Sequence, residues 1–111
     1  MRETTMAFRT TLGGLAAAAL LAAGATAAKA AAPDPVYGLV LATTWCSACH
    51  VVTPVQERAN ADAPSFFWIA NRRDDATLTR YLSNPHGPMP TQALSRLEIA
   101  DIVAYIRSLG Q

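Results

Sequence analysis

The sequence predicts an all-α fold for residues 31–111 of this 111-residue chain. The clearest sign is an apolar stripe at helical spacing near the end of the chain, formed by Ile99, Ile102, Val103, Ile106 and Leu109. A capping box of Ser95 and Glu98 marks the start of that helix, and Gly110 marks its end. Residues 64–70 are apolar enough for a buried strand, but no second strand-like run exists to pair with them. We therefore expect helices joined by loops.

The first helix of the domain is expected over residues 36–45. Asp34 is a suitable N-cap, and Pro35 is favoured in the first turn of a helix. Gly38 lies inside this helix, where glycine costs about 1 kcal/mol relative to alanine. We interpret this glycine as a place where another element of the fold approaches closely.

The middle of the chain predicts two shorter helical elements and a stiff loop. We read residues 64–70 as a loop and short helix that line a cofactor. Asp74 and Asp75 are expected to begin the next helix, because their charge suits a helix N-terminus. The Asn-Pro pair at 84–85 ends it. Residues 86–90, His-Gly-Pro-Met-Pro, then form a loop whose two prolines restrict its shape.

Residues 1–30 have the layout of a secretory signal peptide. A mildly basic start is followed by an apolar stretch of Leu, Ala and Gly and then by A-x-A patterns. We expect cleavage after Ala30, with Ala27 as the second choice, and export to the periplasm. The uncharged stretch 10–28 is 19 residues long, so an uncleaved membrane anchor is the alternative.

The expected mature chain is small and nearly neutral. Its 81 residues bury only a thin core on their own, and two cysteines exclude a disulfide framework. A covalently held cofactor is therefore the expected stabilising group. Six arginines and seven acids give a formal charge of −1. This balance excludes the basic face that nucleic-acid binding requires.

The chain is organised around residues 45–50, Trp-Cys-Ser-Ala-Cys-His. C-x-x-C-H is the attachment signature of a c-type haem, in which the thiols of Cys46 and Cys49 form thioethers with the haem vinyl groups. His50 is then placed to be the proximal ligand of the iron. The alternatives are a redox C-x-x-C and half of a zinc site. Zinc needs two more ligands, whereas the chain has no third cysteine and only His86 as a further histidine. A thioredoxin-like motif needs a βαβ context, which the sequence does not show.

Together, the motif and the helices around it resemble the small class I cytochromes c over essentially all of residues 35–109. That family has a glycine eight residues before the first haem cysteine, where Gly38 stands, and packs an aromatic residue of the last helix against it, where Tyr105 stands. The aromatic residue often found four positions before the cysteine is replaced by Ala42. The resemblance implies N- and C-terminal helices that cross around one covalently bound haem c.

The resemblance also implies the two axial ligands of the haem iron, His50 and Met89. Met89 matches the family's methionine loop, lies between two prolines and is the only methionine after the leader. His86 lies three residues earlier in the same loop, so ligation by two histidines is the rival arrangement.

Two further residues are expected near the haem. Pro64 matches the family's proline whose carbonyl oxygen accepts the N–H of the haem histidine and orients its ring. Trp68 has two alternatives: its indole N–H donates to a haem propionate, or its ring is part of the core. Arg72 and Arg73 are expected to be a solvated pair rather than partners of the propionates.

The function implied by the resemblance is one-electron transfer through a His/Met-ligated haem c, with a comparatively high potential. The partners would be a redox protein donor and acceptor of unknown identity, with membrane contact only if the leader stays uncleaved. An iron with both axial positions filled offers no place for substrate, so we do not expect an enzyme. The alternatives are a cytochrome subunit of a periplasmic dehydrogenase or oxidase complex, and a haem-based ligand sensor or enzyme with a displaceable Met89.

Overall fold

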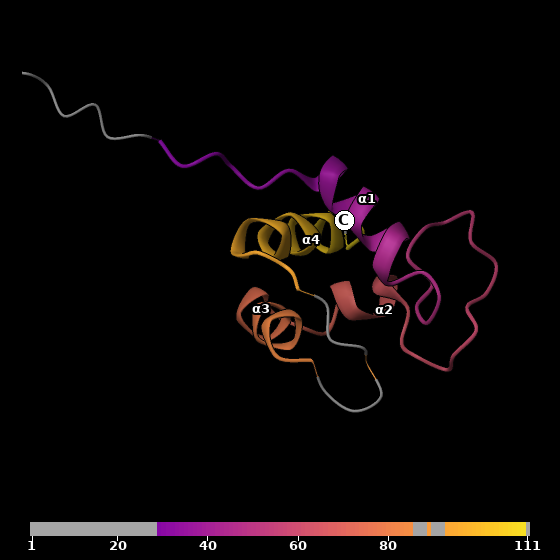
Figure 1. The fold of residues 1–111 in the computed structure, drawn as a ribbon. Helices are drawn as coiled ribbons and strands as arrows, with labels where there is room; N and C mark the ends of the chain where they lie inside the picture. Colours follow the sequence, from indigo (N-terminus) through magenta and orange to yellow (C-terminus); the bar gives the residue numbers. More distant parts are fainter. Residues whose placement is uncertain (1–28, 86–88, 90–92, 111) are drawn as a thin grey trace, which may run out of the picture. The chain divides into compact units, whose positions relative to one another are not determined.

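The computed structural model describes residues 29–85, 89 and 93–110 (Figure 1). Four helices lie in these residues: α1 (Pro35–Trp45), α2 (Phe66–Ala70), α3 (Asp75–Ser83) and α4 (Arg96–Ser108). The described residues contain no strand, and the prediction of an all-α fold is confirmed. Residues Ala31–Gln111 form one compact unit. The predicted signal peptide lies almost wholly outside the described residues.

Helix α1 begins where its capping residue predicts. An Asp34 carboxylate oxygen accepts hydrogen bonds from the backbone N–H groups of Val36 and Tyr37, at 2.8 and 3.3 Å, which satisfies two of the donors left free at a helix N-terminus. The helix ends at Trp45, and Cys46 is its C-cap, donating its N–H to the Ala42 carbonyl at 2.9 Å. The C-x-x-C-H motif therefore starts directly at the end of a helix.

Helix α4 has both hydrogen bonds of the predicted capping box. The Glu98 N–H donates to the Ser95 hydroxyl at 3.2 Å, and the Ser95 N–H donates to the Glu98 carboxylate at 2.7 Å. These bonds favour the ionised carboxylate and hold the pKa of Glu98 below its ordinary value. The apolar stripe predicted for this helix faces the core, and Leu109 at its end is half-buried. The buried residues of α4 are Ile99, Ile102, Val103, Tyr105 and Ile106.

The two short helices are capped by side chains and packed on α4. Ser65 accepts from the Trp68 N–H to begin α2, and Asp74 accepts from the Thr77 N–H to begin α3. Arg107 of α4 connects to both helices: it pairs with Asp75 of α3 and donates to the carbonyl of Ala70 at the end of α2. Among the described helices, α4 is the one that each of the other three packs against (Figure 1).

Helices α1 and α4 approach most closely at Gly38. A Cβ atom built on Gly38 would lie 2.0 Å from the Asp101 carbonyl oxygen and 2.9 Å from the Tyr105 Cβ. No residue with a side chain fits at that separation, so the predicted contact between Gly38 and Tyr105 is confirmed. Ala42, one turn further along α1, is fully buried. The small side chain there agrees with helices that lie this close together.

We expect Gly38→Ala to lower the free energy of unfolding by about 1–3 kcal/mol, because the added methyl group must push the helix backbones apart. Gly110→Ala is the matched control, since a Cβ there would lie 3.4 Å from the nearest atom of Ala70. Denaturant unfolding of the two variants measures the difference. Equal stability of Gly38→Ala and the unchanged protein would contradict this packing.

Candidate functional site

The C-x-x-C-H motif folds into a compact turn that continues from α1. The N–H groups of Cys49 and His50 both donate to the Cys46 carbonyl, at 3.1 and 2.9 Å, and the Ser47 N–H reaches back to the Ala42 carbonyl at 3.1 Å. Cys46 is buried, whereas Cys49 and His50 are half-buried. The two thiols and the imidazole are thereby carried by one short turn at the end of a helix.

The two cysteines form no disulfide with each other. Burial raises the pKa of Cys46 to about 11, and the neighbouring Cys49 adds to this shift. Redox-active C-x-x-C motifs need the opposite, a thiol whose pKa is lowered so that the reactive thiolate forms at neutral pH. The environment of Cys46 therefore argues against the redox alternative.

Among the described side chains, no group of three or more His, Cys, Asp or Glu residues converges as a metal site.

His50 makes the hydrogen bond expected with Pro64. Its Nδ1 atom lies 2.6 Å from the Pro64 carbonyl oxygen. A carbonyl oxygen can only accept, so Nδ1 carries a proton in this contact, and in the neutral imidazole the lone pair is then on Nε2. The Phe66 ring lies 5.4 Å from the imidazole, centroid to centroid, at an angle of 54°. The histidine is therefore oriented, and the nitrogen left available is the one suited to bind a metal.

The loop after the motif is fixed to α4 and to α2. The buried Tyr105 hydroxyl donates to the Val52 carbonyl at 2.5 Å, and the Phe66 N–H donates to the Val51 carbonyl at 3.0 Å. Burial raises the pKa of Tyr105, so its hydroxyl stays protonated and able to donate at neutral pH. These bonds join the residues directly after His50 to two helices.

The structure corrects one alternative for Trp68. Its side chain is 41% exposed, so it is not part of the buried core. The guanidinium groups of Arg72 and Arg73 lie over its ring, 4.7 and 5.5 Å from the centroid. Both arginines are exposed, as expected for a solvated pair, but they share an aromatic partner that the sequence analysis did not anticipate. The proposed contact of Trp68 with a propionate stays a prediction.

Met89 lies half-buried and packs against the hydrophobic core. The rest of the predicted rigid loop, including His86, falls outside the described residues. The structure therefore brings Cys46, Cys49, His50 and Pro64 together and places Met89 against the core they adjoin. The role of Met89 as a second axial ligand stays a prediction.

These residues fit a covalently held haem. Two cysteines that form no disulfide occupy the C-x-x-C positions of a single turn, and the histidine beside them has Nδ1 bonded to Pro64, so that Nε2 is the nitrogen left for a metal. The porphyrin brings its own four nitrogen ligands, so a single imidazole from this turn suffices on one side of the iron. The set of donors present on the turn is the set that attachment of a c-type haem requires.

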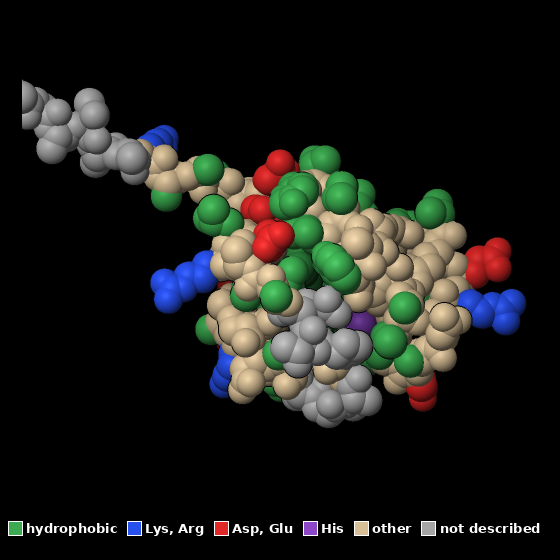
Figure 2. Space-filling view, in the orientation of Figure 1, with side chains coloured by type: hydrophobic (Ala, Val, Ile, Leu, Met, Phe, Trp, Pro, Cys, Tyr) green, Lys and Arg blue, Asp and Glu red, His purple; other side chains and the backbone are tan. Residues whose placement is uncertain are grey.

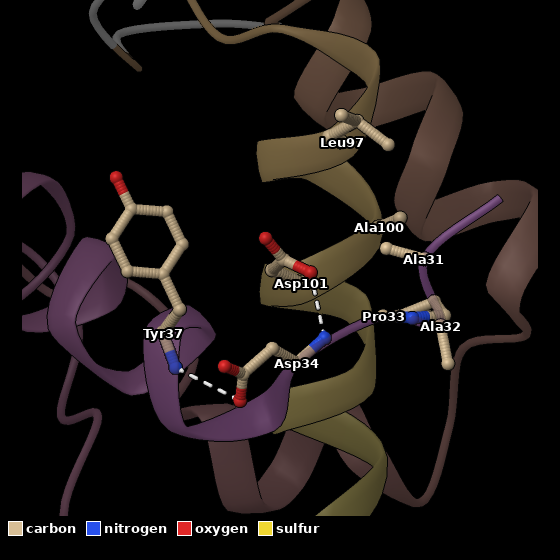
Figure 3. Close-up of a pocket in the computed structure, with 8 residues that line it drawn as sticks. All are labelled: Ala31, Ala32, Pro33, Asp34, Tyr37, Leu97, Ala100 and Asp101. Carbon is tan, nitrogen blue, oxygen red and sulfur yellow. Dashed lines mark hydrogen bonds between the residues drawn. The ribbon is translucent and has the colours of Figure 1, made fainter.

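A separate shallow pocket of about 220 Å³ lies between the segment before α1 and the start of α4 (Figure 3). The Asp34 N–H donates to the Asp101 carboxylate there at 2.7 Å, which ties the beginning of α1 to α4. None of the motif residues lines this pocket, whose walls are formed by Ala31, Ala32, Pro33, Asp34, Tyr37, Leu97, Ala100 and Asp101. It therefore belongs to the helix crossing rather than to the candidate site.

Tyr105→Phe should lower the free energy of unfolding by about 1–3 kcal/mol, because it leaves the buried carbonyl of Val52 without its hydrogen bond. Tyr37→Phe removes a hydroxyl from a side chain that is 46% exposed and serves as the control. Thermal and denaturant unfolding of the two variants compare the two losses. A loss no larger for Tyr105 than for Tyr37 would show that this bond contributes little.

Comparison with known proteins gives one informative relative. Cytochrome c-552 of Bradyrhizobium diazoefficiens is 45% identical to the chain over 92 residues, which cover 81% of this chain and 88% of the relative. No family model matches the chain. No solved structure matches it either.

Proposed function

The chain belongs to the small bacterial class I c-type cytochromes, and on that basis we propose that it is a periplasmic carrier that moves one electron at a time between two other redox proteins. Membership of this family implies a covalently bound haem c, whose iron supplies the change between the ferrous and ferric states. The chain's own residues attach the haem, orient an axial ligand and shape its surroundings.

The observation that carries the proposal is the hydrogen bond between His50 and Pro64. It fixes the tautomer of the imidazole and the direction of the ring, and it leaves Nε2 as the proximal ligand. A carbonyl acceptor on Nδ1 also increases the electron donation of the ring. Cys46 and Cys49, on the same turn, are the residues that would hold the haem through thioether bonds.

We propose Met89 as the ligand on the other side of the iron. Its side chain is half-buried and packs against the hydrophobic core. A thioether ligand opposite an imidazole gives a comparatively high potential, which suits an electron carrier. With both axial positions filled, the iron offers no place for a substrate, and electron transfer is favoured over an enzymatic role.

Export by the leader would place the protein in the periplasm, where its redox protein partners would meet it. Among the residues that the structure describes, no helix is long and apolar enough to cross a bilayer. On the face of the molecule shown in Figure 2, the basic side chains lie apart from one another rather than in one patch. This face therefore has no basic patch of the kind that nucleic-acid binding requires.

Covalent attachment predicts that the haem colour stays with the polypeptide after acid-acetone extraction of denatured protein. Changing both Cys46 and Cys49 to alanine should release all of the haem, whereas either single change leaves one thioether possible. The measurement is the absorption of the protein pellet after extraction. Free extraction of haem from the unchanged protein would show that the attachment is not covalent.

Ligation by Met89 predicts a weak far-red absorption band in the oxidised protein, from sulfur coordinated to ferric iron. Met89→Ala should remove this band and allow external ligands such as carbon monoxide to bind the ferrous protein. His86→Ala, in the same predicted loop, is the matched control and should keep the band. Loss of the sixth ligand in the His86 variant, with the band retained in the Met89 variant, would reverse the assignment and remove the expected high potential.

A further inference from the structure

We propose that Gln56 is the positioning residue of the haem-binding turn: its side-chain amide holds the backbone of the C-x-x-C-H motif in the shape that presents His50. The inference rests on the proposed function, because it takes His50 as the proximal ligand. Gln56 is not part of the motif. It lies six residues after His50, in the loop that leads to α2.

The amide of Gln56 makes four hydrogen bonds to backbone groups of this region. Its Oε1 accepts from the Val52 N–H at 2.9 Å. Its Nε2 has two protons, which donate to the carbonyls of Ser47 at 2.8 Å and of His50 at 2.9 Å, and the Arg58 carbonyl, at 3.2 Å, shares one of them. The side chain is half-buried, and its bonds connect the turn to the loop that follows it.

The chemistry of these partners fixes which end of the amide is oxygen and which is nitrogen. Three of the partners are carbonyls, which can only accept, and the fourth is an N–H group, which can only donate. Only one orientation of the Gln56 amide pairs every donor with an acceptor. A glutamine is therefore matched to this position, since a hydrocarbon side chain provides neither function and a carboxylate has no donor.

The hydrogen bonds of Gln56 give partners to backbone groups that lie outside any helix. The carbonyls of Ser47 and His50 lie just beyond the end of α1, where backbone carbonyls lack the partners that a continuing helix provides. Gln56 supplies a donor to both. Without it, these carbonyls would have only water as a donor, and the turn that carries Cys49 and His50 would have fewer constraints on its shape.

Gln56 also completes the fixation of His50. The imidazole Nδ1 of His50 donates to the Pro64 carbonyl. The backbone carbonyl of His50 accepts from the Gln56 amide. Two residues further on, Val52 is held through its N–H by Gln56 and through its carbonyl by Tyr105. The peptide that carries the proximal ligand is thus anchored at the ring, at its own carbonyl and at the residue beyond.

Loss of Gln56 should therefore alter the axial ligand and not only the stability of the loop. If the His50 backbone shifts, its ring moves relative to the Pro64 carbonyl, and the hydrogen bond that increases electron donation to the iron weakens. Weaker donation favours the ferrous state, so the reduction potential should rise. A residue that merely stabilises the loop would change the unfolding midpoint and leave the potential unchanged.

The experiment compares Gln56→Leu with the unchanged haem-loaded protein. Leucine keeps similar bulk and removes all four hydrogen bonds, so we expect a higher reduction potential and an exchange rate of the Val52 amide with solvent that is about tenfold faster. Asn71→Ala is the matched control, because it removes another amide-to-carbonyl bond, to Phe67 at 2.9 Å in α2. It should change neither quantity. A Gln56 variant with lowered unfolding stability but unchanged potential would overturn the positioning role.

A second measurement needs no variant and applies if Gln56→Leu fails to mature. In the unchanged holoprotein, the two Nε2 protons of Gln56 should exchange slowly with solvent when followed by nitrogen-15 NMR, because they donate to carbonyls in a half-buried site. Exchange at the rate of a free side-chain amide would overturn the inference. Absence of covalent haem from the unchanged protein would instead overturn the proposed function, so the two failures are distinguishable.

Discussion

The close approach of α1 and α4 at Gly38 is the constraint on which the rest of the domain depends. Because no side chain separates the two backbones there, the end of α1 is fixed relative to Tyr105 on α4, and the Tyr105 hydroxyl reaches the Val52 carbonyl just after the motif. The turn that begins at Cys46 is therefore positioned at both ends. At one end it follows the last residue of α1. At the other end it continues into a loop that is bonded to Tyr105 of α4.

Between these two ends, the site is built from individual hydrogen bonds rather than from regular structure. Pro64 contributes a carbonyl to the His50 ring, and Gln56 contributes an amide to the backbone beneath it. A loop can hold a metal ligand precisely only when its own backbone groups have partners, since each free group favours rearrangement toward solvent. The small hydrophobic core contributes the apolar surroundings, and the haem implied by the family adds the apolar mass that a chain of this size lacks.

Sequence reasoning predicted the features that have a local signal. Helix starts were predictable because the side chains of Asp34 and Ser95 accept from the free N–H groups at a helix N-terminus. The close approach of another helix at Gly38 was predictable because this glycine has the family's spacing to the motif. Gln56 was missed because a glutamine in a loop has no pattern that distinguishes a half-buried side chain bonded to the backbone from a solvated one. The arginine partners of Trp68 were missed for a related reason: the contacts of a single aromatic residue depend on which neighbours the fold brings to it.

The central claim is that the protein sets the orientation of His50 through Nδ1 and leaves Nε2 for the iron. NMR of the ferrous holoprotein, labelled with nitrogen-15 at histidine and with carbon-13 at the proline carbonyls, tests it most directly. We expect Nδ1 of His50 to carry a proton that exchanges slowly with solvent and to be coupled through a hydrogen bond to the Pro64 carbonyl carbon, and we expect Nε2 to have the shift of an iron-bound nitrogen. A proton on Nε2, or an Nδ1 proton that exchanges at the rate of a free imidazole, would contradict it.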